Sequence, residues 1–400
     1  MLTERLFDQD PYLRHFEARI IQHTEKGGSP AVALDRTCFY PNAGGQPCDL
    51  GTLSGVPVTD VFEEGEAIVH VLARPLSSGE TVSGEIDWQR RFDHMQQHSG
   101  QHILSQVFLR VASAPTIGFH MGDTSATIDV GRADIPNALL RKIEDAANAA
   151  VLDNHRVVIH TVDAETIHQF DLRRDPVSAE SIRVVEIEGV DQTGCCGTHV
   201  RQTCEVGPIA IIRCENYKGG SRVTFLCGWR AIRDHQVKTE ILREVCQKLT
   251  VGQDELSGRI DRLHEERQAA AKKIRVLTEA ALEGEARILM DDAKSLGEVR
   301  LVTAQFEDRD PKDMQKLVRN LIIRPGVIAA IGVQSERGYL LIGRSADLDL
   351  DVRPILTEAV RSAEGRGGGR PDLAQASFAD PAQCSGVLKS AIDLIIKGAP

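Results

Sequence analysis

The stretch DHMQQHSGQH, residues 93–102, carries three histidines at intervals of four within a segment of helical periodicity. On a helix, His94, His98 and His102 line one face, about 6 Å apart from one to the next. Two histidines with this spacing can bind one zinc ion. The stretch is not the HExxH motif of zinc peptidases, because it lacks the glutamate base. Because histidine pairs with this spacing are also common by chance, the stretch alone predicts a helix with three candidate metal ligands and does not by itself establish a metal site.

A second candidate pair of ligands lies in DQTGCCGTHV, residues 191–200. This tight turn carries Cys195, Cys196 and His199. A thiolate and an imidazole would complete, with two of the upstream histidines, a set of nitrogen and sulfur ligands that suits zinc better than magnesium. The alternative is a buried free thiol beside a structural histidine. Spacing alone selects neither the two histidines of the first stretch nor the cysteine of the second.

The segments around the first stretch predict two different architectures. Residues 17–86 contain short alternating or apolar runs separated by Gly, Pro and Ser, a pattern typical of a small β-barrel. Residues 89–112 have helical spacing. A strand at 125–130, a helix from Pro136 to about Leu152 and a strand at 157–163 then predict an α+β unit.

The C-terminal part predicts long helices followed by an α/β unit. Residues 229–296 have the pattern of one or two long helices, which would pack in an intramolecular hairpin or in a dimer. Buried strands are expected at 301–306, 326–333 and 338–345, and helices at 311–324 and 352–363, before a glycine-rich loop, GRGGGRPDLAQ (365–375). The heptad seam of the long helix consists of Leu256, Ile260, Leu263, Arg267, Ala270, Ile274, Leu277 and Ala281.

Composition limits the class of protein. The chain has 400 residues, 42% of them hydrophobic and 26% charged, which predicts a multidomain globular protein. The chain has no apolar run of about 18 residues, so we expect no membrane span. It has no signal-peptide pattern, and its nine cysteines are an odd number, so we expect reduced thiols in the cytoplasm. A net charge of -11 argues against broad, non-specific binding of nucleic acid.

HSGQH and CCGTH together resemble the HxxxH and CxxxH motifs of the alanyl-tRNA editing family, which includes the editing domain of alanyl-tRNA synthetase and the free-standing AlaX proteins. YPNAGGQPCDLG (40–51) is similar to the glycine-rich segment of the family's N-terminal barrel. RGGGRPDLAQA (366–376) is similar to the conserved loop of the DHHA1 domain. Because these motifs follow the family's order over nearly the whole chain, the chain resembles the long form, AlaX-L.

The resemblance implies an α+β multidomain fold in four parts. These are a β-barrel domain at 1–87, a zinc-containing α+β editing core at 88–230, a coiled-coil-like helical spacer at 231–297, and an RNA-binding α/β DHHA1 domain at 298–400. One zinc ion per chain is implied, and its ligands are His98, His102, Cys195 and His199. Cys196 stands where many relatives have glycine. His94 lies outside the motif and is expected at the surface or in contact with one of the metal-ligating residues.

The substrate implied by the resemblance is tRNA(Ala) that carries serine or glycine in error. A site built for alanine cannot exclude the smaller glycine by size, and it rejects serine only weakly, by about 1–3 kcal/mol. A second site that hydrolyses the ester corrects both errors. Zinc would either activate water and polarise the ester carbonyl or only position the substrate, and the sequence does not choose between these roles.

Further site residues follow from the same resemblance. Gln101 is expected near the metal, with Thr116 and Thr127 as further candidate catalytic groups and with Thr127 facing inward. The segment 115–130 would supply the amino-acid pocket, with Gly118 and Phe119 in its lining. RNA would contact Arg366 and Arg370 of the glycine-rich loop, and a cluster of Tyr217, Lys218, Arg222 and Arg230.

Other functions fit parts of the pattern. A complete alanine–tRNA ligase needs an ATP-binding domain before the barrel, and the barrel is expected to begin within about 20 residues of Met1. A catalytically inactive tRNA-binding module with a structural zinc would also use four protein ligands. A threonyl-type editing domain is a further alternative, which the GGGRPDLAQ loop argues against. The heptad seam makes a homodimer worth testing.

Overall fold

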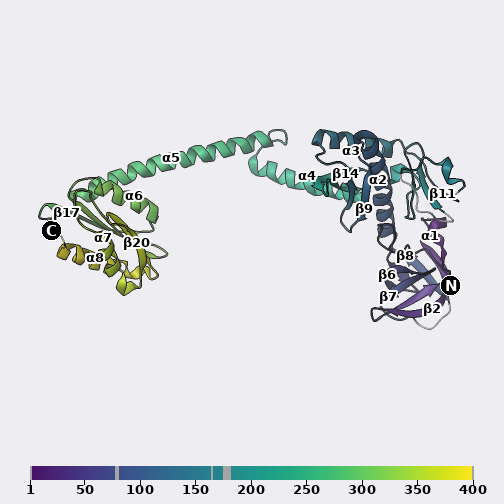
Figure 1. Ribbon diagram of the computed structural model, residues 1–400, viewed down its shortest axis with the longest axis horizontal. Coiled ribbons are helices and arrows are strands. Elements are labelled where there is room, and N and C mark those ends of the chain that lie inside the picture. Colours follow the sequence, from purple (N-terminus) through teal and green to yellow (C-terminus); the bar gives the residue numbers. More distant parts are fainter. Residues whose placement is uncertain (1, 77–80, 164, 174–181, 399–400) are drawn as a thin grey trace. The chain divides into compact units, whose positions relative to one another are not determined.

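The computed structural model describes residues 2–76, 81–163, 165–173 and 182–398 (Figure 1). Its contacts divide the chain into two compact units, Met1–Lys248 and Leu249–Pro400. Each unit has hydrophobic cores of its own. Among the described residues, no helix is long and apolar enough to cross a membrane.

The first part of the chain folds into a closed β-barrel. Each strand pairs with two neighbours in the order β2-β3-β7-β6-β5-β8, and the ring closes where β8 pairs with β2. Alternating residues such as Leu34, Leu53 and Val61 are fully buried in the core. A short β1-β4 pair and helix α1 precede or flank the ring. The elements are β1 (Glu4–Arg5), α1 (Leu6–Gln9), β2 (His15–Lys26), β3 (Ser29–Leu34), β4 (Arg36–Thr37), β5 (Gly51–Leu53), β6 (Val56–Glu64), β7 (Ala67–Leu72) and β8 (Thr81–Ile86).

The long helix α2 (Trp88–Ala112) is the central element of the next part. Asp87 caps its start by accepting a hydrogen bond from the amide of Arg90, as acidic residues commonly do at this position. The helix packs on a four-stranded sheet of order β14-β15-β10-β9 and on α3, and a separate sheet has the order β11-β12-β13. The remaining elements are β9 (Thr116–Met121), β10 (Ala126–Val130), α3 (Asn137–Leu152), β11 (Val157–Val162), β12 (Ile182–Ile187), β13 (Asp191–Gly194), β14 (Ile209–Tyr217) and β15 (Gly220–Cys227).

A buried ion pair attaches α2 to the segment between β4 and β5. The guanidinium of Arg91 is fully buried, and its Nε lies 3.0 Å from both carboxylate oxygens of Asp49. Its Nη1 donates to the carbonyl of Pro11 at 2.8 Å. Removing one partner would leave a buried charge uncompensated, which costs roughly 3–5 kcal/mol. The glycine-rich segment is therefore fixed beside the histidine-bearing helix.

The predicted long helices occur as two, α4 (Trp229–Leu249) and α5 (Leu256–Asp291). The heptad seam of α5 is mostly exposed, with 50% of Ile260, 64% of Ile274 and 58% of Leu277 accessible to solvent. Only Leu282, Ala286 and Met290 near its C-terminus are buried, against the sheet of the second unit. The helix ends before the predicted residue 296, because 294–296 form strand β16.

The second unit contains a six-stranded sheet of order β16-β17-β18-β19-β21-β20. The buried strands and both helices expected after residue 300 are confirmed, although the second helix is shorter than predicted. The glycine-rich segment is not a loop but the edge strand β20, because its glycines allow close pairing: a Cβ on Gly367 would lie 2.2 Å from the carbonyl oxygen of Gln375. The elements are β16 (Lys294–Leu296), β17 (Val299–Glu307), α6 (Pro311–Ile322), β18 (Val327–Gln334), β19 (Gly338–Arg344), α7 (Val352–Ala359), β20 (Arg366–Arg370), β21 (Leu373–Phe378) and α8 (Cys384–Gly398).

Candidate metal centre

Four side chains from the two sequence stretches meet beside α2. The potential ligand atoms of His98, His102, Cys195 and His199 all lie within 4.8 Å of one another. The sulfur of Cys195 is 3.3 Å from Nε2 of both His98 and His199. Cys196 is exposed and outside this group. The fold thus selects one cysteine of the adjacent pair and two of the three histidines.

The turn that carries Cys195 can approach α2 only because it contains a glycine. A Cβ on Gly197 would lie 2.0 Å from Cε1 of His98, well inside van der Waals contact. Gly100 of the helix allows a different close approach, to strand β15, because a Cβ there would lie 2.2 Å from the sulfur of Cys227. These two close approaches explain why the motifs read CCGTH and HSGQH.

Each histidine of the cluster has its Nδ1 engaged by another residue. His98 Nδ1 lies 2.9 Å from Oε1 of Gln46, His102 Nδ1 lies 3.1 Å from Oδ2 of Asp191, and Nδ1 of His199 lies 3.1 Å from Oγ of Ser99. Such contacts fix the ring orientation and the tautomer of metal-binding histidines. They leave the three Nε2 atoms for a metal ion.

Gln46, Asp191 and Ser99 were not predicted as site residues, although all three stand within the quoted motifs. Gln46 also donates from Nε2 to the hydroxyl of Thr198 at 2.9 Å and accepts from the Thr198 amide at 3.1 Å. It therefore joins the glycine-rich segment, α2 and the cysteine turn. Asp191 is held in turn by Nε of Arg173 at 2.8 Å.

The electrostatics of the cluster favour a thiolate at Cys195 and a neutral imidazole at His199, which are the states that metal binding requires. Burial disfavours the thiolate of Cys195, but the neighbouring imidazoles of His98 and His199 hold its pKa well below the usual value. Burial lowers the pKa of His199 to about 3 and keeps it neutral. For His102, burial lowers the pKa, but the bonds to Asp191 and Cys195 outweigh it and the pKa is raised. A metal ion bound at Nε2 of His102 would compete with a proton for that nitrogen.

Three family models match the chain. They describe tRNA synthetases class II (A) at residues 13–90, the threonyl and alanyl tRNA synthetase second additional domain at 182–224, and the DHHA1 domain at 298–397. The alanyl-tRNA editing protein AlaX-L of Pyrococcus horikoshii is 30% identical over 388 residues, which cover 94% of each chain. The chain belongs to the AlaX-L family of alanyl-tRNA editing proteins.

This AlaX-L family member is also similar to alanine–tRNA ligases. The ligase of Pyrococcus abyssi is 31% identical over 412 residues, which cover 98% of this chain and 44% of the ligase. The chain thus spans less than half of the length of the ligases that it matches. Among solved structures, the C-Ala domain of Aquifex aeolicus alanyl-tRNA synthetase matches 26% of this chain and 95% of its own, with 22% identity. Its TM-score of 0.24 is too low to support a conclusion.

Two of the residues expected in the amino-acid pocket of this AlaX-L protein lie on the same side as the metal cluster. Thr116 donates to Oγ of Ser105 at 2.7 Å, and Nε2 of Gln101 donates to the same hydroxyl at 2.8 Å. The ring of Phe119 lies 5.4 Å from the ring of His98. Gln101, Thr116 and Phe119 therefore lie along α2, beside or beyond the metal ligands.

Thr127 and Gly118 lie on the other face of the sheet. Along β10, Ala126, Ile128 and Val130 are buried against α2, so the alternation of a strand directs Thr127 away from it. Gly118 pairs with Asp129, which shares that outer face. The interpretation of Thr127 as facing inward is wrong, because the pleat, which the sequence did not fix, assigns the buried face to its neighbours.

The structure divides the predicted cluster of basic and aromatic residues. Arg222 binds both carboxylate oxygens of Asp129, at 2.7 and 2.8 Å, and covers the ring of Tyr217 at 3.8 Å, next to Lys218 in the β14–β15 turn. Arg230 follows the opposite end of β15 and binds a different residue, Asp93 of α2. The predicted RNA contacts Arg366 and Arg370 are exposed on β20, in the second unit.

Proposed function

We propose that the protein hydrolyses the ester bond of tRNA(Ala) that carries serine in error, and that glycine is the second substrate. The observation that carries the proposal is the buried group of His98, His102, Cys195 and His199 in a chain of the AlaX-L family. The relative's printed name describes alanyl-tRNA editing, which is the activity assigned here.

Zinc is the metal that the site fits. The donors are three imidazole nitrogens and one thiolate, within one small volume, and each imidazole is oriented by a further hydrogen bond. One zinc ion per chain would be held by His98, His102, Cys195 and His199. When bound, the ion supplies Lewis acidity beside the substrate ester.

The chain's own hydroxyl groups would select the amino acid. Ser105 lies one turn beyond Gln101 on α2 and receives hydrogen bonds from Gln101 and Thr116. A site that bonds to a substrate hydroxyl discriminates strongly against a substrate that lacks it. We therefore assign Gln101, Ser105 and Thr116 to the recognition of the serine side chain, which would spare correctly charged alanyl-tRNA and would make glycine, which also lacks the hydroxyl, the slower of the two substrates.

The tRNA itself would be held by contacts away from the cluster. Arg366 of the DHHA1 domain and Lys218 are exposed and available to phosphates, and Arg370 is exposed but lies 3.4 Å from the carboxylate of Asp372. Arg222 would contribute less, because its guanidinium is already bound to Asp129. Because the chain carries a net charge of -11, binding must rely on such local groups.

The experiment is a deacylation assay with Ser-, Gly- and Ala-tRNA(Ala) and with the wild-type protein, His102→Ala and the control His264→Ala. His264 is an exposed histidine of α5. We expect rapid loss of serine, slow loss of alanine, near-complete inactivation by His102→Ala and wild-type activity in the control. Equal rates for all three substrates would contradict the proposal.

A structural zinc is the second candidate function. Four protein ligands can close a zinc site completely, which is the usual arrangement of structural zinc. In that case His102→Ala would lower the melting temperature, and the wild-type protein would bind tRNA(Ala) without cleaving any ester.

We propose a second copy of the chain as a further partner. The exposed residues Ile260, Ile274 and Leu277 of α5 follow heptad spacing, which is typical of a helix that pairs with another helix. Light scattering of the full chain should give twice the mass of the chain, and Ile274→Lys with Leu277→Lys should halve it. A monomeric wild-type protein at micromolar concentration would contradict this.

A further inference from the structure

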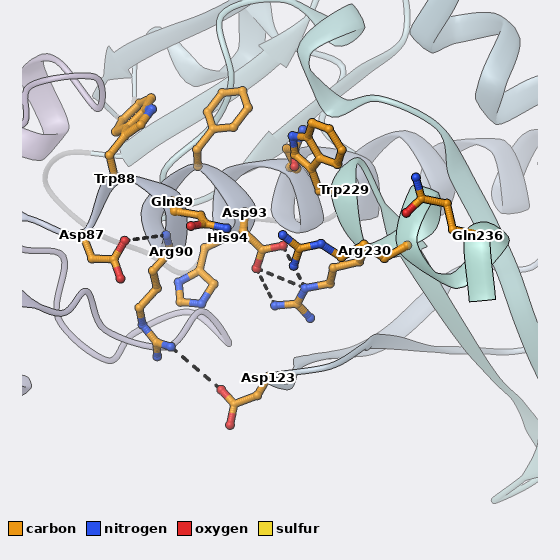
Figure 2. A pocket seen from close by; sticks show the side chains of 13 residues that line it. Asp87, Trp88, Gln89, Arg90, Asp93, His94, Asp123, Trp229, Arg230 and Gln236 are labelled. Carbon is orange, nitrogen blue, oxygen red and sulfur yellow. Dashed lines mark hydrogen bonds and ion pairs between the residues drawn. The ribbon is translucent and has the colours of Figure 1, made fainter.

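A cavity lies one helical turn before the metal ligands, at the start of α2. Its volume is about 870 Å³, within the range of roughly 300–1,000 Å³ typical of ligand pockets. Trp88 and Trp229 line it, and these are the two tryptophans of the chain. In Figure 2, the labelled tryptophans lie on one side of α2, and Arg90, His94 and Arg230 lie on the other.

The cavity contains a buried polar group that lacks a partner. His94 is 1% exposed, and its Nδ1 has no hydrogen-bond partner among the residues that the structure describes. An unsatisfied buried group of this kind costs about 1–3 kcal/mol. The expectation that His94 lies at the surface is therefore wrong. A ligand in the cavity that offers a hydrogen bond would satisfy this nitrogen.

Three arginines line the cavity, and they differ in how firmly they are held. Arg230 binds Asp93 and the carbonyl of Gly122. Arg90 donates from Nε to the carbonyl of Cys48 at 3.0 Å, which leaves its Nη groups, of which Nη1 lies 4.0 Å from a carboxylate oxygen of the exposed Asp123. Arg233 is exposed and forms no ion pair within the described ranges of the chain. Two guanidinium groups are thus available for a phosphate.

The cavity lies in line with the metal centre. Strand β9 and the residues after it follow α2 in the opposite direction: Thr116 contacts Ser105, the ring of Phe119 lies 5.4 Å from that of His98, and Asp123 approaches Arg90. Along this strip, the order is amino-acid pocket, metal ligands, cavity. An aminoacyl-tRNA has the same order of amino acid, ester and terminal nucleotides.

We propose that this cavity binds an unpaired nucleotide at the 3′ end of the RNA whose ester lies at the metal centre, an inference that rests on the proposed function. The base stacks on the exposed ring of Trp229, as bases do on aromatic side chains of proteins that bind single strands. Arg233 and Arg90 contact the phosphate. Nδ1 of His94 bonds to the base edge or to a ribose hydroxyl.

The two tryptophans make the cavity directly observable. Tryptophan-selective fluorescence of the full chain reports only Trp88 and Trp229, both of which line this cavity. The probes are uncharged tRNA(Ala), the same tRNA without its unpaired 3′-terminal nucleotides, and AMP. We expect saturable quenching by the intact tRNA, at least tenfold weaker binding of the truncated tRNA, and no saturation by AMP in the same concentration range.

The variants Trp229→Ala and Arg233→Glu test the contacts themselves. Both residues are exposed, so neither substitution should disturb folding, which circular dichroism would check. We expect Trp229→Ala to weaken tRNA binding, measured by filter retention, about tenfold, Trp229→Phe to restore most of it, and Arg233→Glu to weaken it several-fold. Arg141→Glu, a matched change at an exposed arginine of α3, should have no effect.

The outcomes separate this inference from the proposed function. Equal quenching by intact and truncated tRNA, or wild-type binding by both variants, would overturn the inference even if deacylation is observed. Saturation by AMP with the affinity of the tRNA would also overturn it, in favour of a free-nucleotide site. If no ester is cleaved but the variants bind the intact tRNA weakly, the cavity keeps its role and the proposed reaction fails. In an active enzyme, Trp229→Ala should raise KM with little change in kcat.

Discussion

His98 and His102 lie on the same helix as His94, in successive turns, yet their ring nitrogens are treated differently. Nδ1 of His98 and Nδ1 of His102 are engaged by Gln46 and Asp191, which leaves Nε2 of each ring directed at a common point. Nδ1 of His94 is buried without a partner in the part of the chain that the structure describes. The first arrangement directs ring nitrogens at one point, whereas the second leaves a ring nitrogen without a protein contact among the described residues.

Burial alone therefore does not identify the role of a histidine. All three rings are almost inaccessible to solvent, at 1–2% exposure. The rings differ in the contact made by Nδ1. A hydrogen bond to Nδ1 fixes the tautomer and leaves Nε2 free to bind a metal ion. A buried Nδ1 without a hydrogen bond indicates that a partner is missing. Experiments that disturb one region and leave the other intact can test the distinction.

Removal of the metal should have the largest effect. Dialysis against a chelator should reduce deacylation of Ser-tRNA(Ala) on the order of a hundredfold or more, because the Lewis acid contributes several kcal/mol to such reactions. Quenching of tryptophan fluorescence by uncharged tRNA should persist, since no cluster residue lines the cavity. Loss of both deacylation and fluorescence quenching would show that the metal centre and the cavity are not independent. Restoration of activity by added zinc is the control.

Loss of a supporting contact should have an intermediate effect. Asp191→Ala removes the carboxylate that holds Nδ1 of His102, and such changes typically lower metal affinity 10–100-fold. Competition with a chromophoric zinc chelator would measure this. Asp145→Ala, at an exposed aspartate of α3, is the matched control. Unchanged zinc affinity in Asp191→Ala would mean that the hydrogen bond between Asp191 and Nδ1 of His102 does not support metal binding.

The smallest effect is expected from His94 and appears as a dependence of stability on pH. Burial, with the positive charges of Arg90 and Arg230, lowers the pKa of His94 to about 3, below the ordinary value of 6.5. Its contribution to stability is therefore complete above pH 6.5 and is lost as the pH falls below that value, because the unfolded chain then binds a proton that the folded chain rejects. From pH 6.5 to pH 5 the loss is about 2 kcal/mol.

The variant His94→Gln should remove this acid sensitivity. Urea unfolding of the metal-free wild-type protein, His94→Gln and the exposed control His120→Gln at pH 7 and pH 5 would measure it. Between pH 7 and pH 5, we expect the free energy of unfolding of His94→Gln to fall by about 2 kcal/mol less than that of the other two proteins. An equal change in the free energy of unfolding between pH 7 and pH 5 in all three proteins would show that the ring of His94 exchanges protons freely with solvent.

Local patterns predicted most of the secondary structure. The helix at 89–112 was expected from its periodicity and occurs as α2, and the strands expected in residues 17–86 occur nearly as predicted. Two expectations were wrong for one reason. The segment 365–375 pairs as an edge strand, and Thr127 lies on the outer face of β10, because both depend on a neighbouring strand rather than on local sequence.

The sequence by itself determined which residue types could form the metal site and where they stand: histidines four apart on a helix, and a cysteine and histidine four apart on a turn. It also carried the motif order that indicates the family. The long-range contacts added that Gln46 orients His98 across 52 positions of the chain and that His94 is buried and lines the same cavity as the two tryptophans, and they placed Cys195, the ligand implied by the resemblance, rather than Cys196 against the histidines. The physical reason is that orientation and burial depend on long-range contacts, which spacing along one chain does not encode.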